Sequence, residues 1–220
     1  MMKRFLHKYG HAWVFLYAFI YLPWFFYLER TVTTRYHIIH VSLDDYIPFN
    51  EYFIIPYLFW FVYVAGAVLY FFFTDKGDFY RLCAFLFTGM TISLAICTIY
   101  PNGTDFRPII DPDKNIFCAM VAALHKVDTC TNVLPSIHVY NSIGVHIAVM
   151  NSERLREHRL LCRASFFAMA AICLSTVFLK QHSVIDGMAA ITMAYCLHDV
   201  IYGSAYESSR RRAAEKVPEI

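Results

Sequence analysis

The chain has 220 residues, a formal net charge of +2 and a hydrophobic fraction of 58%, with 20 Phe and 16 Tyr. A soluble domain of this length is about half apolar, so this composition argues against one and favours an integral membrane protein. The small net charge gives no reason to expect a nucleic-acid partner.

Six mainly apolar runs are candidates for membrane-spanning helices, which need about 20 residues. The runs cover residues 12–28, 51–73, 82–100, 137–150, 160–179 and 184–203. The fourth run is short and contains Tyr140, Asn141 and His146. We expect an all-α polytopic membrane protein with six transmembrane helices, forming a single domain over residues 1–220.

The basic residues predict the orientation of this domain. With six spans and cytoplasmic termini, 13 of the 19 basic residues lie in cytoplasmic segments, as the positive-inside rule requires. These are Lys3, Arg4, Lys8, Lys76, Arg81, Arg154, Arg156, Arg159, Arg163, Arg210, Arg211, Arg212 and Lys216. The connection 101–136 and residues 180–182 then lie on the extracytoplasmic side. The compact length favours a bacterial plasma membrane.

Two connections on that side have distinctive patterns. Residues 44–49 combine acidic and apolar side chains, which fits either a short interfacial segment or a surface loop. Residues 114–127 alternate apolar and polar groups, so we expect a helix on the membrane surface that shelters a site. Cys118 and Cys130 share the second connection, and a disulfide between them is permitted in an oxidising compartment.

The sequence Pro135-Ser136-Ile137-His138 comes immediately before the fourth run. Proline is suited to the start of a helix, and unpaired N–H groups there bind anions such as phosphate. Taken alone, the pattern is also ordinary helix capping, with a histidine at the water interface.

A second histidine lies in the sequence Lys180-Gln181-His182-Ser183-Val184-Ile185-Asp186. We expect His182 and Asp186 to share one helix face, because they are four residues apart. An ionisable pair is costly near a membrane, so it indicates a function. With His138, Arg107 and Lys180, the pair forms a set suited to phosphoryl transfer: a nucleophile with its carboxylate, a general acid and two cations.

These residues resemble the motifs of the type 2 phosphatidic acid phosphatase superfamily, which read Lys-x6-Arg-Pro, Pro-Ser-x-His and Ser-Arg-x5-His-x3-Asp. The second motif is matched in full by residues 135–138. The first is matched by Arg107 and Pro108, with Tyr100 at the lysine position. The third is matched by Ser175, His182 and Asp186, with Thr176 at the arginine position. The motif region covers residues 100–186.

The resemblance implies a metal-independent lipid phosphatase with no cofactor and a membrane lipid as substrate. It assigns His182 as the nucleophile that forms a phosphohistidine, Asp186 as the residue that orients it, and His138 as general acid and then base. Ser136 and Arg107 would bind phosphate. Phosphatidic acid, phosphatidylglycerol phosphate and undecaprenyl diphosphate are the implied substrates.

The two missing cations leave alternatives open. Lys180 either turns into the site to replace one cation or extends to the membrane interface. With Thr176 at the arginine position, the third motif resembles that of the branch that contains the inositol phosphorylceramide synthases. This resemblance implies a phosphotransferase that uses the same histidines. A non-catalytic phospholipid-binding protein is the third alternative. A zinc site of His138, His182 and Asp186 is conceivable, but no further ligand spacing supports it.

Overall fold

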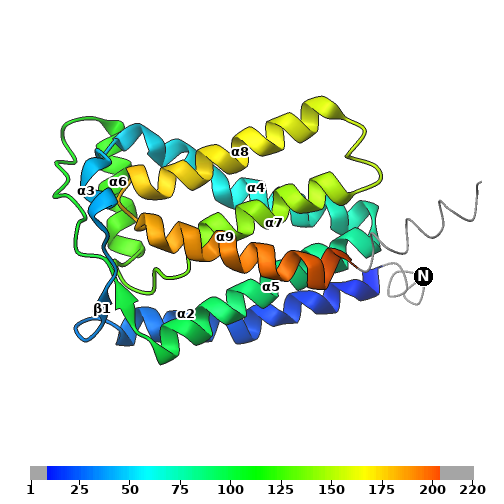
Figure 1. Ribbon diagram of the computed structural model, residues 1–220, viewed down its shortest axis with the longest axis horizontal. Coiled ribbons are helices and arrows are strands. Elements are labelled where there is room, and N and C mark those ends of the chain that lie inside the picture. The colour runs from blue at the N-terminus through cyan, green and yellow to red at the C-terminus, as the bar shows by residue number, and fades with distance from the viewer. Residues whose placement is uncertain (1–8, 204–220) are drawn as a thin grey trace, which may run out of the picture.

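The computed structural model describes residues 9–203, and in this range it is an elongated helical bundle (Figure 1). Six helical segments run between the two ends of the bundle, in alternating directions (Figure 1). They are η1 (Gly10–Tyr17) continued by α2 (Ala18–Thr31), α4 (Ile54–Thr74), α5 (Lys76–Ile99), α7 (Ile137–Asn151), α8 (Arg159–Phe178), and α9 (Val184–His198) continued by η3 (Asp199–Gly203). The expected all-α class is confirmed.

Five segments of the described chain are long and apolar enough to cross a membrane, which makes this a multi-pass membrane protein. They are Gly10–Thr31, Glu51–Thr74, Lys76–Ile99, Arg159–Phe178 and Val184–Gly203. The remaining expected span is α7, which has only 15 residues. At about 1.5 Å per residue it is roughly 22 Å long, shorter than the hydrocarbon core of about 30 Å.

Helix α7 packs against α4, α5, α8 and α9. The polar residues Asn141 and Ser142, which weakened its hydrophobic pattern, are buried within the bundle. Because neighbouring helices cover most of α7, its sequence does not need the continuous apolar surface of a lipid-exposed helix.

Two glycines bring α5 and α7 close together. A Cβ atom on Gly89 of α5 would lie 2.1 Å from the ring of Tyr140, and one on Gly144 of α7 would lie 2.6 Å from the ring of Phe85. The two rings stack at 4.8 Å between centroids, and the Tyr140 hydroxyl donates to the Phe85 carbonyl (2.8 Å). The absence of side chains at the two glycines makes room for both aromatic rings.

Side chains with a capping preference define several helix starts. Asp75 accepts from the Asp78 N–H at the start of α5, and Asn115 accepts from the Cys118 N–H at the start of α6 (Ile116–Val127). Ser136 and Ser183 cap α7 and α9 in the same way. Helix α5 therefore begins at Lys76, six residues before the apolar run.

Three connections gather at one end of the bundle, at the left of Figure 1. The first contains β1 (His37–Ile38), α3 (Ser42–Tyr46) and η2 (Glu51–Phe53), and the second contains β2 (Asn102–Gly103) and α6. Strand β1 pairs in parallel with β2, with His37 opposite Asn102. The third connection is the turn between α8 and α9. We call this part of the molecule the loop end.

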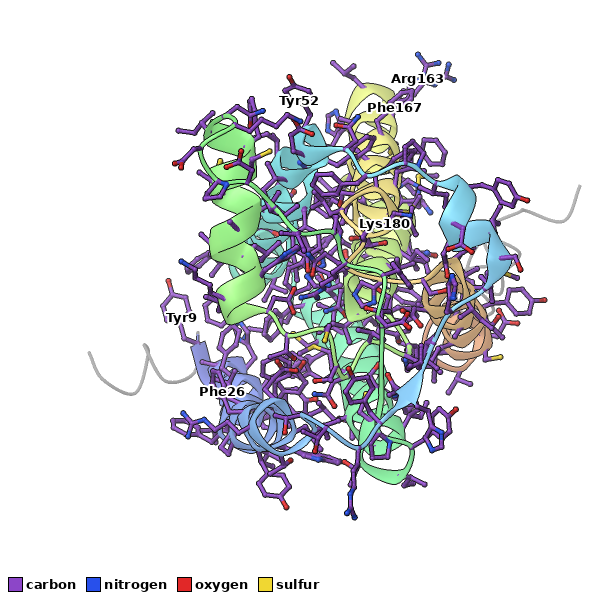
Figure 2. All side chains as sticks on the ribbon, turned by 90° about the vertical axis from the view of Figure 1, so that its left-hand side faces the viewer. Tyr9, Phe26, Tyr52, Arg163, Phe167 and Lys180 are labelled. Carbon is purple, nitrogen blue, oxygen red and sulfur yellow. The ribbon has the colours of Figure 1, made fainter. Side chains whose placement is uncertain are left out.

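The elements of the loop end agree in part with the sequence. Residues 42–46 form a short helix, and Ile47 lies immediately beyond it. The helix expected at 114–127 is present as α6, which contacts η2 and α4. Viewed onto the loop end, Lys180 lies between α6 on one side and α3 on the other (Figure 2).

Candidate functional site

Ser136 and His138 lie at the start of α7, at the loop end. Ser136 is fully buried and caps the helix by accepting from the Val139 N–H (3.5 Å). The His138 ring packs against two aromatic residues of α4, with centroids 4.6 Å from Tyr57 and 4.5 Å from Trp60. Its Nδ1 atom is buried and has no hydrogen-bond partner among the described residues. The aromatic contacts therefore fix the position of the ring and leave a polar atom for another group.

His182 lies in the turn before α9, so the expected shared helix face is wrong. Helix α8 ends at Phe178, and the chain then turns through Lys180, which has a positive φ of 58°. The backbone N–H groups of Gln181 and His182 both donate to the Thr176 carbonyl (3.0 Å each). Helix α9 begins at Val184, after the cap residue Ser183.

The His182–Asp186 pair nevertheless forms, because Asp186 is part of a capping box. Its Oδ2 atom accepts from the Ser183 N–H (2.9 Å) and lies 3.3 Å from His182 Nδ1. A carboxylate only accepts, so in the neutral imidazole this contact places the proton on Nδ1 and leaves the free lone pair on Nε2. Asp186 is fully buried. The capping box thus draws the carboxylate back towards a histidine outside the helix.

The residues from the two motifs meet in space. The His138 and His182 rings are 5.7 Å apart between centroids, and the Ser136 N–H donates to the Asp186 carbonyl (3.2 Å). His182 is buried, with 9% of its side chain exposed. Two histidines, one of them paired with a carboxylate, therefore lie together where α7 and α9 begin.

Arg107 lies near this pair but is already bound to the protein. Its Nη1 and Nη2 atoms donate to the carbonyls of Asp128 (2.6 Å) and Thr129 (2.7 Å), while Nε is buried without a partner among the described residues. The Asp128 carboxylate accepts from the hydroxyl of Tyr57 (2.6 Å), whose ring packs on His138. Arg107 thus connects to His138 through Asp128 and Tyr57.

Lys180 does not follow the second expected course, an extension to the membrane interface. Its side chain is buried, and Nζ donates to the backbone carbonyl of Asp44 in α3. Nζ also lies 5.7 Å from the centroid of the Phe106 ring. The side chain therefore turns inwards and does not extend to the membrane interface, and its recorded hydrogen bond is to α3.

The two motif positions without a cation hold residues with contacts of their own. Thr176 is buried, and its hydroxyl donates to the Cys173 carbonyl (2.8 Å). The Tyr100 ring stacks on His37 at 4.3 Å between centroids. Neither position supplies a positive charge.

Several residues at this end were not identified from the sequence. Tyr57 and Trp60 belong to the apolar pattern of a membrane span, so no sequence signal distinguished them. Gln181 is buried, and both polar atoms of its side chain lack a partner within residues 9–203; its place beside His182 was the available signal. Asp44 is also buried and contacts the His182 turn, although its sequence resembled a surface segment.

Three further histidines lie outside this pair. His125 lies on α6, the helix expected at residues 114–127, where burial and then the charge of Arg107 lower its pKa. His40 pairs with Asp45 (2.9 Å), and His146 is hydrogen-bonded to Ser165 (3.1 Å).

The cysteines and possible metal ligands give no second site. Cys118 and Cys130 are both free, so the permitted disulfide is not formed. Within residues 9–203, no group of three or more His, Cys, Asp or Glu side chains is arranged to hold a metal ion.

Comparisons of the chain with family models, with curated proteins and with solved structures found no match.

Proposed function

We propose that this chain is a membrane lipid phosphatase that hydrolyses a lipid phosphomonoester or diphosphate through a phosphohistidine at His182. The observation that carries the proposal is the meeting of His182, paired with Asp186 at 3.3 Å, and His138, whose ring centroid is 5.7 Å from that of His182. The two histidines come from different helix starts, 44 positions apart in the chain. A carboxylate that fixes the tautomer of one histidine leaves its other nitrogen ready to attack.

The proposed first step uses the free lone pair of His182 Nε2. It attacks phosphorus, a P–N bond forms, and the P–O bond to the lipid breaks as protonated His138 donates to the departing oxygen. Asp186 stabilises the imidazolium character that develops on His182. In the second step His138 accepts a proton from water, the water oxygen attacks phosphorus, and the P–N bond breaks to release phosphate.

Phosphate binding in this proposal uses the start of α7 and Arg107. The first N–H groups of α7 favour an anion through their unpaired donors and the helix dipole, and Ser136 has a hydroxyl proton to donate. The Nη atoms of Arg107 already have carbonyl partners, so Nε is its remaining donor. Lys180 contributes charge from beside α3.

The proposed membrane setting counts α7 as a sixth crossing, surrounded by longer helices. The described chain then begins and ends at the same end of the bundle, opposite the loop end (Figure 1). We place the loop end on the extracytoplasmic side of a bacterial plasma membrane. Seven of the 13 basic residues in the positive-inside argument lie outside the described residues, namely Lys3, Arg4, Lys8, Arg210, Arg211, Arg212 and Lys216.

The substrate in this proposal has its phosphate at the loop end and its acyl or prenyl tail between helices. Phosphatidic acid, phosphatidylglycerol phosphate and undecaprenyl diphosphate all fit this description. Each has a phosphate in the headgroup region and a long apolar tail that remains in the bilayer.

A lipid phosphotransferase is the second candidate, and the small number of cations that are free to bind phosphate among the described site residues favours it. Thr176 replaces a motif arginine, and the Nη atoms of Arg107 are bound to carbonyls. A phosphodiester carries less negative charge than a phosphomonoester or a diphosphate, and it needs fewer cations. In this alternative a lipid or sugar hydroxyl, in place of water, attacks the phosphohistidine.

The test is phosphate release by the purified protein in detergent, with EDTA, from phosphatidic acid, phosphatidylglycerol phosphate, undecaprenyl diphosphate and farnesyl diphosphate. The variants are His182→Ala and a control, His198→Ala, whose side chain pairs with Asp199 at the opposite end of the bundle. We expect EDTA-resistant release that His182→Ala abolishes and His198→Ala retains.

Absence of phosphate release from every donor would reject the phosphatase. A new phospholipid product formed from a phosphodiester donor, and lost in His182→Ala, would then identify the phosphotransferase. Binding of phospholipid without either product would identify a non-catalytic lipid-binding protein.

A further inference from the structure

Helix α3 makes a concentrated set of contacts with the turn that carries His182. It is a five-residue helix in the connection between α2 and α4, and it lies at the loop end (Figures 1 and 2). One of its residues, Asp44, is 3% exposed. A buried carboxylate is costly unless hydrogen bonds compensate it, so the partners of Asp44 indicate what holds it there.

The Asp44 carboxylate binds the residues that directly follow His182. Its Oδ2 atom accepts from the Ser183 hydroxyl (2.6 Å), and its Oδ1 atom accepts from the Val184 N–H (2.8 Å). Oδ2 also accepts from the Val41 N–H (3.0 Å), within its own segment. Both carboxylate oxygens are therefore occupied. The two partners at the start of α9, Ser183 and Val184, are 139 and 140 positions away in the chain.

The backbone of Asp44 binds the residue that precedes the Gln181–His182 pair. Lys180 Nζ donates to the Asp44 carbonyl, and Lys180 has the positive φ of 58° at which the chain leaves α8. Such a conformation is unfavourable for a residue with a Cβ atom and persists where surrounding contacts hold it. One residue of α3 thus holds the His182 turn on both sides.

These contacts continue to the nucleophile proposed above. The hydroxyl of Ser183 donates to Asp44 and accepts from the Ile185 N–H (3.3 Å), which fixes the cap. The Ser183 N–H donates to Asp186 Oδ2, the same oxygen that faces His182 Nδ1. A shift of Ser183 would therefore move the carboxylate that orients His182.

We infer that Asp44 is a positioning residue, which fixes the reactive orientation of His182 by clamping the 180–184 turn from helix α3. It acts through Ser183, Val184 and Lys180 and does not touch the phosphate. The expected effect of an Asp44 substitution on kcat rests on the proposed function. The expected effect of the same substitution on the exposure of His182 does not.

The kinetic test compares Asp44→Asn with Asp45→Asn. Asparagine is close in size to aspartate, but its NH2 group would face the Ser183 hydroxyl or the Val184 N–H, both of which donate. Asp45 is the matched control, because its side chain is 62% exposed and its recorded partner is His40. We expect Asp44→Asn to lower kcat about 10²-fold, the effect of displacing a catalytic group by about 1 Å, with KM nearly unchanged. Asp45→Asn should retain the kcat of the wild type.

A second measurement does not require turnover. Diethyl pyrocarbonate modifies histidine, and peptide mapping by mass spectrometry gives the rate at His182, with His198, whose side chain is 40% exposed, as internal reference. We expect Asp44→Asn to raise the rate at His182, which is 7% exposed, and Asp45→Asn to leave it unchanged. The rates are compared below the unfolding temperature of each variant.

Ser183→Ala provides a second route if Asp44→Asn does not fold. It removes one of the two α9 contacts and retains the Val184 N–H, so a smaller change in the same direction is expected in both measurements. Wild-type protein without turnover would reject the proposed function, and the His182 modification rates alone would then decide the positioning role. The positioning role of Asp44 would be overturned if Asp44→Asn, Ser183→Ala and Asp45→Asn had equal His182 modification rates and equal kcat.

Discussion

The α5–α7 contact and the loop end are stabilised by different means. Between α5 and α7, two glycines admit two stacked aromatic rings, and close packing fixes the relative position of the helices. At the loop end, hydrogen bonds to carboxylates join distant segments: buried Asp44 holds the 180–184 turn, and partly buried Asp128 binds Tyr57 of α4. Changes at the first region should therefore act on stability, and changes at the second should act on activity.

The largest effect is expected for Asp186→Asn at the loop end. Asparagine retains an acceptor for the Ser183 N–H, but it no longer enforces the His182 tautomer with the proton on Nδ1. In a serine protease the equivalent change lowers kcat about 10⁴-fold, and we expect a loss of this order here. Phosphate release measured beside thermal unfolding would check it. If unfolding of the variant explained its lost activity, the loop end would act on stability, and the proposed difference between the two regions would be wrong.

The second effect is expected for Gly89→Ala in the α5–α7 contact. Alanine normally stabilises a helix by about 1 kcal/mol relative to glycine, but here its Cβ would lie 2.1 Å from the buried Tyr140 ring. Overpacking of this kind costs about 1–3 kcal/mol, so the thermal midpoint in detergent should fall while the kcat of the folded fraction is retained.

Gly66→Ala on α4 is the control, because nothing lies within 4 Å of the added Cβ. It should leave the midpoint unchanged or raise it. A similar midpoint for Gly89→Ala would mean that the Tyr140 ring moves aside without cost, and that the contact is not fixed by shape.

A smaller effect is expected for Arg107→Lys. The guanidinium holds two carbonyls at once, and an ammonium group is a point charge that does not reproduce this geometry. Hydrogen bonds to a charged group contribute about 1.5–3 kcal/mol, so we expect kcat/KM to fall at least about tenfold. Exposed Arg35 provides the control substitution, Arg35→Lys. Equal kcat/KM for both variants would remove Arg107 from the site.

The smallest effect concerns Lys114, whose Nζ donates to Glu51 (2.8 Å) between α6 and η2. The hydrogen bond to Glu51 and the opposite charge raise the pKa of Lys114. The ion pair stabilises the folded state at pH values below the ordinary lysine pKa. This stabilisation is lost as the pH rises through the higher pKa that Lys114 has in the folded protein.

Lys114→Met should therefore lower the thermal midpoint slightly at neutral pH, as measured by thermal unfolding in detergent. The difference from the wild type should disappear once the pH exceeds the folded-state pKa of Lys114. A difference that persisted at high pH would exclude the ion pair as its cause.

The sequence predicted the helices best where apolar runs and caps coincide. The run 184–203 corresponds to α9 with η3, because Ser183 provides a cap immediately before it. The apolar run begins six residues after the start of α5, because Lys76, Asp78 and Arg81 interrupt the hydrophobic pattern in the first turns that follow the cap residue Asp75. Helix α7 is too short to meet the length of a span, and its polar residues are explained by burial among other helices.

The candidate site was predicted in composition and only partly in geometry. His138, His182, Asp186 and Ser136 do lie together, although His182 precedes α9. Lys180 binds a segment 136 positions away, and Arg107 binds two carbonyls 21 and 22 positions further along its own connection. No local pattern relates Asp44 to Ser183, because their contact is a property of the packed bundle and not of either segment.

The Asp44–Ser183 contact also determines when the site becomes complete. It closes a loop of 139 residues, and each doubling of loop length costs about 0.6 kcal/mol of chain entropy. Relative to a contact across one helical turn, this is roughly 3 kcal/mol, which only the packed bundle can offset. The proposed nucleophile therefore acquires its clamp late in assembly, after α4, α5, α7 and α8 have been made. A chain that is released before Ser183 lacks this contact, so the orientation proposed for His182 depends on the finished protein.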